Sequence, residues 1–534
     1  FVRLWIIQRH PLRDEIHELD KIEQKKSPSH IILHSKTINS PLSYPGDINI
    51  NLHQPSEVNT SAIPVKSNLI VLTTIASAVF ITASLLLTGI SQMRTCPTDE
   101  RKELGVFCVV DNSRISRGNS TFFPEINNIP RDKGIQAFQQ ANYQEAITLF
   151  QQAVDANRYD PEVLIYYNNS LARQQGSPFT LAVVVSLDKN KTTPVEVLRG
   201  VAQAQDQFNR NKGLNRRLLE IVIANDSNTK KAKEVAQELT KDSSIIGVIG
   251  HNSSEATKAA LPEYEKAKLA LVSPTSASIF LNNPVFFRVV YSDESAGKKL
   301  AEYTYRNLLK KAVVFGNPSS TYSNSIREIF TNQFEKLGGE VVRKPLIDLT
   351  ASKFDPEKEV TNSVYDYKAE AALLFPDADT INKAIPIAKE ITKINKTLKT
   401  QNPPKPELKM LGGGILYKGD ILANGRKNVE GLIIAVPWFG ETLQTQPFAE
   451  KSARKWGGGI SWRTAISFDA TQALIKTLSN NATRDTVLRG LENVSLTASE
   501  TSGYPLKFTP EREREGQSIL LQIQQGQFTM IPND

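Results

Sequence analysis

Between residues 244 and 278 the sequence twice places a short apolar segment directly before a loop of small, hydroxyl-bearing residues. The first copy, SIIGVIGHNSSEATKAAL, predicts a strand over Ile245–Ile249 and a helix that opens at Ser253 and Ser254. The second copy, KLALVSPTSASIF, predicts a strand over Leu269–Val272 before a similar loop. Uninterrupted apolar strands that alternate with helices are typical of a parallel sheet covered on both faces.

These two loops are candidates for a binding site. In sheets of this kind ligands bind beyond the carboxyl ends of the strands, where helix N-termini present free backbone N–H groups. Ser253 and Ser254 follow the first strand, and Thr275, Ser276 and Ala277 follow the second. Such loops can hold a small anionic or polar ligand but offer no groups for chemistry on it. Serine also caps helices without any ligand, so both explanations of Ser253 and Ser254 stay open.

The distribution of histidine argues against an enzyme. Five of the six histidines lie in the first 53 residues, and only His251 follows them. A catalytic triad or a multi-histidine metal site would depend on His251 alone. The sequence contains no P-loop, HExxH or GxSxG motif. We therefore predict no catalytic residue, metal or cofactor, and we expect His251 to be a packed loop residue.

Composition limits the partners and the number of domains. The 534 residues exceed a single domain, and the net charge of +8 is spread thinly over interleaved acidic and basic residues. Without a dense basic tract that carries aromatic residues, nucleic acid is excluded as a partner.

One long apolar segment indicates a membrane anchor. Residues 67–93 contain no charged residue, and this length exceeds the roughly 20 residues that cross a bilayer. We predict a transmembrane helix at 67–91, with a buried core helix as the alternative. Residues 1–66 then form an N-terminal head and flexible linker, and residues 92–130 an extracytoplasmic linker that contains Cys96 and Cys108. We expect these cysteines to face an oxidising compartment and to pair.

Residues 131–176 resemble a tetratricopeptide unit. The positions that carry this resemblance are Gly134, Phe138, Tyr143, Ala146, Phe150, Ala153 and Pro161. The small Ala146 and Ala153 let two helices approach closely, Phe150 fills the space between them, and residues 162–175 supply a third helix. An ordinary helical hairpin is the alternative. One and a half repeats are too few for a solenoid, so we expect this unit to pack on its neighbour or to bind a partner.

From Phe179 onward the pattern alternates strand and helix in two series. The first series of predicted strands is Leu181–Val185, Leu218–Ala224, Ile245–Ile249, Leu269–Val272 and Phe286–Val290. The second is Ala312–Phe315, Glu340–Arg343, Ala371–Phe375, Met410–Leu411 and Leu432–Val436. Two series of similar size predict an α/β fold over residues 177–534, with two doubly wound lobes and a ligand cleft between them.

Eight motifs in order give residues 179–531 a resemblance to the type I periplasmic binding proteins of the branched-chain amino acid class, the solute receptors of ABC importers. The motifs are AVVVSL, GVIGHNSS, VSPTSAS, FFRVVYSDES, FEKLGGEVV, VEGLIIAVPWF, SWRTAISFDATQAL and QIQQGQF. The resemblance implies a receptor for a small solute that works with an ABC permease or a signalling partner. It also favours a single-pass membrane protein whose C-terminal domain lies in the periplasm, an orientation that the charges around the apolar segment leave open.

The resemblance also implies site residues. In that family the ligand carboxylate is held by a serine of the GH-x-x-S loop, which is Ser254 here. Hydroxyl and amide groups after the SP dipeptide also hold it, and these are Thr275, Ser276 and Ala277. An aromatic residue of the second lobe, Tyr322 here, closes over the ligand.

Two positions depart from the family pattern. Gly414 stands where the family has the acidic partner of the ligand ammonium, and Ala277 stands where a threonine helps. Unless Asp377, Asp379 or Asp420 compensates, carboxylates without an amine should bind at least as well as amino acids.

Two functions from different classes fit these features. One is a membrane-anchored solute-binding protein of an ABC importer or of a sensory receptor. The other is a scaffold without a ligand, because lipoprotein activators of peptidoglycan synthases also join tetratricopeptide-like helices to this fold. Trp438, after Pro437, lines the cleft or lies in the core, and both alternatives stay open, whereas Trp462 and Phe468, at helical spacing, are expected in the core. We expect Asp226 and Asp293 to be helix caps.

Overall fold

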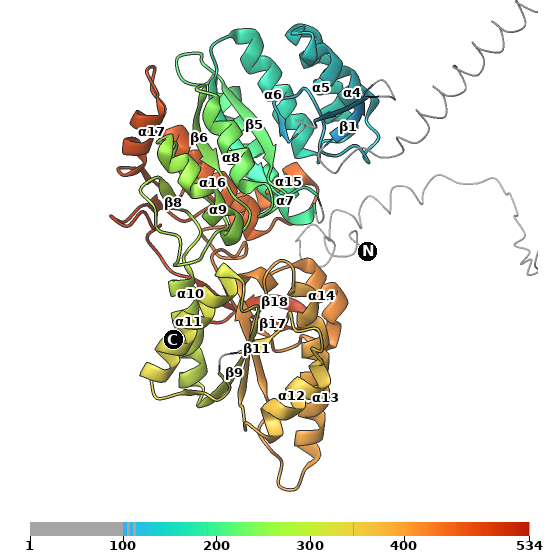
Figure 1. The fold of residues 1–534 in the computed structure, drawn as a ribbon, viewed down its shortest axis with the longest axis vertical. Coiled ribbons are helices and arrows are strands. Elements are labelled where there is room, and N and C mark those ends of the chain that lie inside the picture. The colour runs from blue at the N-terminus through green and yellow to red at the C-terminus, as the bar shows by residue number, and fades with distance from the viewer. Residues whose placement is uncertain (1–99, 104–106, 111–113, 189–190, 345, 533–534) are drawn as a thin grey trace, which may run out of the picture. The chain divides into compact units, whose positions relative to one another are not determined.

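The computed structural model describes residues 100–103, 107–110, 114–188, 191–344 and 346–532, which belong to one compact unit. The predicted transmembrane helix and Cys96 lie outside these residues, so the membrane span and the disulfide stay predictions. No helix within the described ranges is long and apolar enough to cross a bilayer. The chain from residue 179 onward folds into two α/β lobes (Figure 1).

Lobe 1 is built on a six-stranded sheet in the order β3-β5-β4-β6-β7-β8. Its strands are β3 (Ile115–Ser116), β4 (Phe179–Val185), β5 (Leu219–Asn225), β6 (Ile245–Ile249), β7 (Leu271–Ser273) and β8 (Phe286–Arg288). Its helices are α7 (Thr192–Arg210), α8 (Ala232–Lys241), α9 (Ser254–Lys266), α15 (Gln446–Trp456), α16 (Trp462–Lys476) and α17 (Arg484–Leu491). Only the short edge strand β3 runs antiparallel. Every residue of β4, β5 and β6 is buried, which explains why these strands are mostly apolar.

Lobe 2 is built on an eight-stranded sheet in the order β10-β9-β12-β13-β14-β17-β18, with β11 beside β9. Its strands are β9 (Lys311–Gly316), β10 (Glu340–Val341), β11 (Ile347–Asp348), β12 (Ala371–Phe375), β13 (Lys409–Gly413), β14 (Ile433–Val436), β17 (Ile519–Gln524) and β18 (Gln527–Met530). Its helices are α10 (Asp293–Arg306), α11 (Thr321–Lys336), α12 (Pro356–Tyr365), α13 (Ala384–Thr400) and α14 (Gly419–Gly425), with short 3-10 turns η1 (Ile381–Lys383), η2 (Gly414–Leu416) and η3 (Arg426–Asn428).

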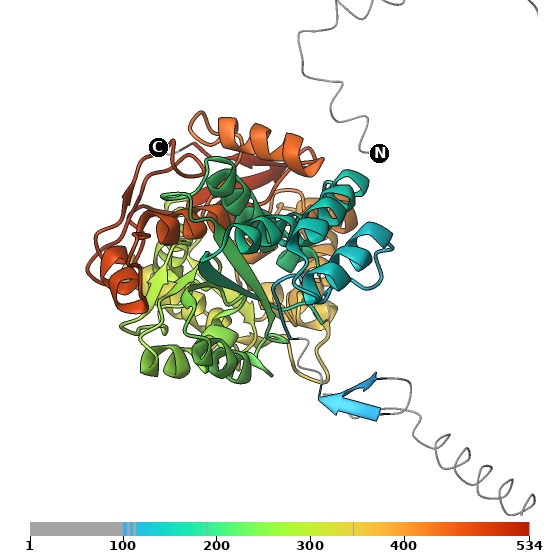
Figure 2. The same cartoon turned by 90° about the horizontal axis from the view of Figure 1, so that it is seen from above.

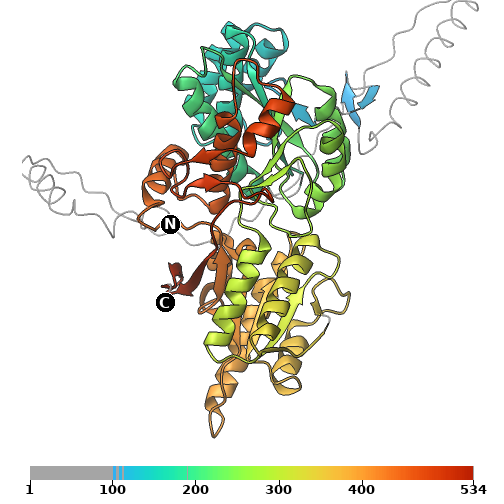
Figure 3. The ribbon, with the colours of Figure 1, turned by 90° about the vertical axis from the view of Figure 1, so that its left-hand side faces the viewer.

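The chain passes between the lobes three times, at residues 289–292, 437–445 and 508–518. Figure 3 shows these segments meeting between the lobes, with α10 and α11 side by side on one face of lobe 2. Because β14 ends at the cleft and the chain re-enters lobe 2 there, β17 pairs with β14 in the antiparallel direction. The prediction of two doubly wound lobes is therefore confirmed, and the antiparallel strands β3, β17 and β18 are additional to the strands that the sequence predicts.

Two small hairpins complete the described elements. They are β1 (Glu100–Glu103) with β2 (Phe107–Val110), and β15 (Ser495–Leu496) with β16 (Leu506–Lys507).

Three helices precede the first long strand. They are α4 (Ile129–Gln139), α5 (Tyr143–Ala156) and α6 (Pro161–Gln175), seen in teal beside lobe 1 in Figure 2. A Cβ atom on Gly134 of α4 would lie 2.8 Å from the ring of Phe150 on α5, so only glycine permits this close approach. The fully buried Phe150 fills the space between helices, as the sequence predicts.

The last of these helices, α6, contacts lobe 1 along the part of β5 that the short strand β3 leaves unpaired. On α6 the amide of Asn169 donates to the carbonyl of Ile221 (2.7 Å) and accepts from its N–H (2.8 Å). On α7 the amide of Asn209 makes the same two bonds with Leu219, at 3.0 and 2.8 Å. Two side-chain amides thus replace a neighbouring strand and satisfy backbone groups that an edge would leave unpaired. The expectation that the helical unit packs on its neighbour is confirmed.

Candidate ligand-binding cleft

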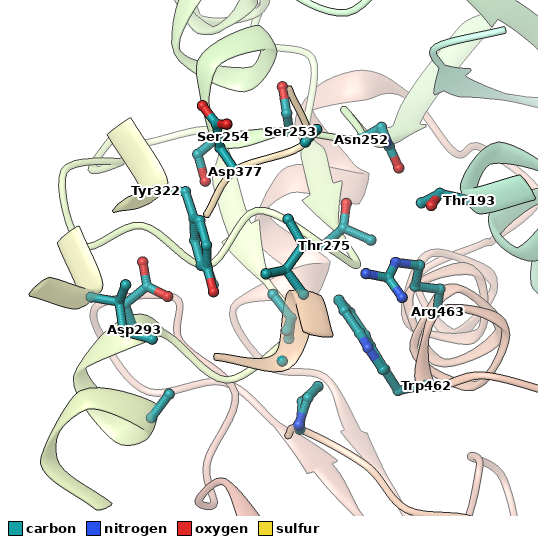
Figure 4. A pocket seen from close by; sticks show the side chains of 18 of the residues that line it. Thr193, Asn252, Ser253, Ser254, Thr275, Asp293, Tyr322, Asp377, Trp462 and Arg463 are labelled. Atoms are coloured by element: carbon teal, nitrogen blue, oxygen red, sulfur yellow. The ribbon is translucent and has the colours of Figure 1, made fainter. Parts of the chain in front are cut away.

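A cavity of about 170 Å³ lies between the two lobes, at the carboxyl ends of the strands. Lobe 1 contributes residues from the loops after β6 and β7 and from the start of α16. Lobe 2 contributes residues from α10 and α11 and from the segments after β12 and β13. Figure 4 shows the labelled side chains converging on this space from both lobes.

Ser253 and Ser254 form one wall of the cavity at the start of α9. Ser253 is the N-cap, because its hydroxyl accepts a hydrogen bond from the N–H of Ala256 (3.2 Å) and donates one to Asn228 (2.5 Å). Ser254 is the first helical residue and is buried at the cavity. The N-cap role explains Ser253 without a ligand, whereas Ser254 remains available to one.

The loop after β7 provides Thr275 and Ala277 but not Ser276. The hydroxyl of Thr275 donates to the carbonyl of His251 (3.0 Å), which ties the two predicted loops together. Ser276 is fully buried, and its hydroxyl lies 2.7 Å from that of Thr257 on α9. Its N–H donates to Ser273 (3.0 Å), so the structure places Ser276 in the scaffold of the loop and outside the cavity lining.

Tyr322 reaches the cavity from α11, on the opposite lobe from Ser254. Its hydroxyl oxygen is buried against Gly413, where an added Cβ atom would lie 2.2 Å from it. Burial raises the pKa of Tyr322, so the hydroxyl stays protonated and can donate. Gly414 also lines the cavity and contributes no side chain to it, as the sequence indicates.

A carboxylate that the sequence analysis assigned to helix capping lies in this cavity. Asp293 is the first residue of α10, after the N-cap Ser292, and is 1% exposed. One of its carboxyl oxygens has no hydrogen-bond partner in the described structure. Burial raises the pKa of Asp293 to about 7. A buried carboxyl with a free oxygen at a cavity is a candidate ligand group rather than a cap.

The start of α16 brings two further side chains that sequence analysis missed as site residues. Trp462 is part of the lobe 1 core, as predicted, but it also lines the cavity, with its indole N–H buried and unpaired among the described residues. Arg463 is 5% exposed, and its guanidinium points into the cavity over the Trp462 ring, 4.3 Å from the ring centroid (Figure 4). Lys418 lines the cavity from lobe 2.

The sequence of residues 194–527, more than half of the chain, matches the family described as periplasmic binding protein. The chain belongs to the periplasmic binding protein family. Its type I two-lobed fold is that expected from the sequence motifs.

Relatives of this periplasmic binding protein are known by sequence and by structure. An "amino acid binding protein" of Pseudomonas aeruginosa is 28% identical over 144 residues, which are 26% of this chain and only 38% of that protein. A branched-chain amino acid transporter substrate-binding protein of Streptococcus pneumoniae, solved with isoleucine, superimposes with a TM-score of 0.58 at 16% identity, over 66% of this chain and 99% of its own. A solute-binding protein of R. palustris, solved with benzoate, gives a TM-score of 0.56 at 15% identity, over 66% and 96%.

The remaining polar residues near the cleft of this periplasmic binding protein have structural partners. His251 is fully buried, with Nδ1 2.7 Å from Asp226 and Nε2 2.9 Å from the hydroxyl of Tyr264, which confirms it as a packed loop residue. Asp226 is therefore not a helix cap, because its carboxylate faces His251 and accepts from the N–H of Asn228 (2.8 Å). Asp377 lines the cavity but accepts from Asn317 (2.6 Å).

Two aromatic and two acidic residues complete the set of candidates near the cleft. Trp438 lies in the core, where its indole donates to the carbonyl of Ser502 (3.0 Å), and Phe468 is buried. Asp379 lines the cavity, whereas Asp420 does not.

Proposed function

We propose that this periplasmic binding protein captures a small carboxylate solute in the cleft, outside the cytoplasm, and closes its lobes over it. The main support for this proposal is that both lobes of the described chain place buried polar groups without hydrogen-bond partners at the cavity. Lobe 2 supplies a carboxyl oxygen of Asp293 and the hydroxyl of Tyr322, and lobe 1 supplies the indole N–H of Trp462 and the amide oxygen of Asn252, from the loop after β6. Unpaired buried groups cost stability, which a ligand would restore by bonding to them.

The proposed pose follows from these groups. The ligand carboxylate lies at the N-terminus of α9, where the Ser254 hydroxyl and the helix dipole favour an anion, and Thr275, whose hydroxyl donates to His251, forms the neighbouring wall. Tyr322 then covers it from lobe 2. Ala277 provides space and backbone at the same loop, and an amine on the ligand would lie at Asp293, which supplies the acidic partner that Gly414 cannot.

Co-purification tests this function directly. Small molecules released from the natively expressed protein by denaturation are identified by mass spectrometry, and calorimetric titration then measures each one, together with leucine, isoleucine, glutamate and benzoate. We expect a carboxylate to be recovered and to bind. The absence of binding by every compound recovered or tested would overturn the proposal and favour the scaffold, in which the same fold and helices regulate a cell-envelope partner.

We further propose that the protein is anchored by a helix at 67–91 and that it delivers its solute to an ABC permease or acts as a sensory ectodomain. The three helices α4 to α6 are proposed to be a tetratricopeptide-like unit docked on lobe 1. A free-thiol count on the unreduced native protein tests the orientation. Paired Cys96 and Cys108 give no free thiol, whereas two free thiols contradict an oxidising location.

A further inference from the structure

Arg463 differs from the other buried arginines of the described chain. Four arginines are buried there, and three of them pair with a carboxylate, Arg131 with Asp132, Arg288 with Glu513 and Arg514 with Asp469. Arg463 forms no ion pair or hydrogen bond through its guanidinium with any described residue. After burial, the carboxylate of Glu196 has the largest effect on the pKa of Arg463, but this carboxylate pairs with Arg199 (2.9 Å) and accepts from the hydroxyl of Thr464 (2.6 Å).

The position of Arg463 on its helix also lacks a structural reason. It is the second residue of α16, where the helix dipole disfavours a positive charge. A buried, unpaired cation at a helix N-terminus lowers stability on two counts, desolvation and the dipole. Its pKa is lowered by burial to about 10, so the guanidinium still carries its charge at neutral pH.

A second cation faces the same cavity from the other lobe. Lys418 immediately precedes α14 and, like Arg463, has no carboxylate within ion-pairing distance in the part of the chain that the structure describes. Burial and then the charge of Arg463 lower the pKa of Lys418 to about 8. Two positive charges, one from each lobe, therefore repel each other across the cleft. An anion between them would remove this repulsion and would favour closure.

The cations lie apart from the proposed amine partner. In Figure 4, Tyr322 and Asp293 lie on one side of Thr275, and Trp462 and Arg463 lie on the other. A ligand whose amine is at Asp293 and whose first carboxylate is at Ser254 and Thr275 would thus extend its far end toward Arg463. The apolar face of Trp462 beneath the guanidinium fits a short carbon chain at that point.

Building on the proposed function, we propose that Arg463 and Lys418 together bind a second anionic group of the ligand, which makes the solute a small dicarboxylate, such as an acidic amino acid, rather than an aliphatic amino acid. Arg463 supplies a planar pair of donors that fits a carboxylate, and Lys418 adds a second charge from lobe 2.

Titration calorimetry of the full chain with acid and amide pairs tests this inference. The probes are L-glutamate with L-glutamine and L-aspartate with L-asparagine, because each pair differs only in the charge of the distal group. We expect at least one acid to bind 10- to 100-fold more tightly than its amide. Arg463→Gln should abolish this difference and change amide binding less than about threefold. Lys418→Gln should reduce the difference between acid and amide. Lys476→Gln, an exposed change on α16, the helix of Arg463, should leave the difference intact.

Thermal unfolding separates a binding role from a structural one. Without ligand, Arg463→Gln should unfold at the same or a higher temperature, because it removes an unpaired buried cation; a lower temperature would indicate that Arg463 holds the fold together. Equal binding of acid and amide by the unmodified protein overturns the inference, and so does equal weakening of both by Arg463→Gln. Binding of leucine or benzoate, with no binding of glutamate or aspartate, also overturns the inference of a second anionic group, while the proposed function stands. Binding of no compound overturns the proposed function itself.

Discussion

Glu255 on α9 accepts a hydrogen bond from the hydroxyl of Ser320 (2.7 Å), the N-cap of α11, so that a carboxylate of lobe 1 meets a helix N-terminus of lobe 2 at the wall of the cavity. The same oxygen also lies 3.3 Å from the backbone nitrogen of Tyr322, which donates to it. An acidic group is favoured at a helix N-terminus by the dipole and by the free N–H groups. This contact therefore favours the arrangement in which the two lobes meet at the cavity.

Replacing Glu255 should loosen the closed state. We expect Glu255→Gln to weaken ligand affinity by about 3- to 10-fold, mainly through faster dissociation, because a charge-assisted bond between the lobes is lost. Stopped-flow release of the ligand and the radius of gyration from X-ray scattering are the measurements. Glu263→Gln, which removes a carboxylate near Lys266 on the same helix, is the control. Unchanged dissociation and an unchanged radius would show that the contact has no role in closure.

The two serines at the start of α9 should separate binding from folding. Ser254→Ala should weaken carboxylate binding about 10- to 100-fold with little change in stability, because it removes a donor to the ligand. Ser253→Ala should lower the free energy of unfolding by about 1 kcal/mol, because it removes the N-cap bond to Ala256. Titration calorimetry and urea unfolding measure the two effects. Tight binding of leucine or valine that is unaffected by Ser254→Ala would show that the pocket has been placed wrongly.

Most of the fold follows from apolar patterning. The bounds of β6 and β12 agree with the predicted Ile245–Ile249 and Ala371–Phe375, because strands buried on both faces must be apolar throughout. Gly338, at a φ of +97°, follows the last turn of α11, as the pair of glycines predicts. The apolar pattern does not predict β17 and β18, because glutamines interrupt their apolar residues. The direction of these strands depends on where the chain re-enters lobe 2.

Only some of the site residues could be predicted from the sequence, because the others come together through the path of the chain and not through a local motif. Ser254 and Thr275 follow strands directly, so a local motif identifies them. The sequence around Asp293 and Arg463 resembles ordinary helix starts, and their meeting in one cavity depends on two passages of the chain between the lobes. The sequence does contain one indication of a functional role for Arg463, because the helix dipole disfavours a cation in the first turn of a helix.

The amide of Asn169 should be essential to the docking of the three helices. Asn169→Ala leaves the backbone N–H and carbonyl of Ile221 buried without partners, and we expect a loss of about 3 kcal/mol in the free energy of unfolding. Gln174→Ala, an exposed change on the same helix, should cost little. Chemical denaturation measures both. Similar small losses for the two variants would mean that the amide does not hold the edge of β5.

The last prediction concerns pH and the amine of the ligand. The pKa of Asp293 is raised from 3.8 to about 7, mainly by burial, with a smaller contribution from the nearby Glu255 and Glu513, while a bond from Ser325 and the charge of Arg288 oppose the rise. At pH 5 the carboxyl is therefore protonated in the folded protein and cannot pair with an ammonium. Affinity for amino acids should rise from pH 5 to pH 8, by up to about tenfold per pH unit, the limit for one linked proton.

Matched ligands isolate the effect of the amine. Glutamate compared with glutarate, and leucine compared with 4-methylpentanoate, differ only in the ammonium, so the compounds without it should show no such rise. For the stability of the protein without ligand, the pH dependence has the opposite sign. The unfolded chain releases the Asp293 proton near pH 4 and the folded chain near pH 7. The free energy of unfolding should therefore fall as the pH rises between these values. Asp293→Asn should remove both dependences. An amino acid affinity that stays flat with pH, or that survives Asp293→Asn unchanged, would place the ammonium elsewhere in the cleft.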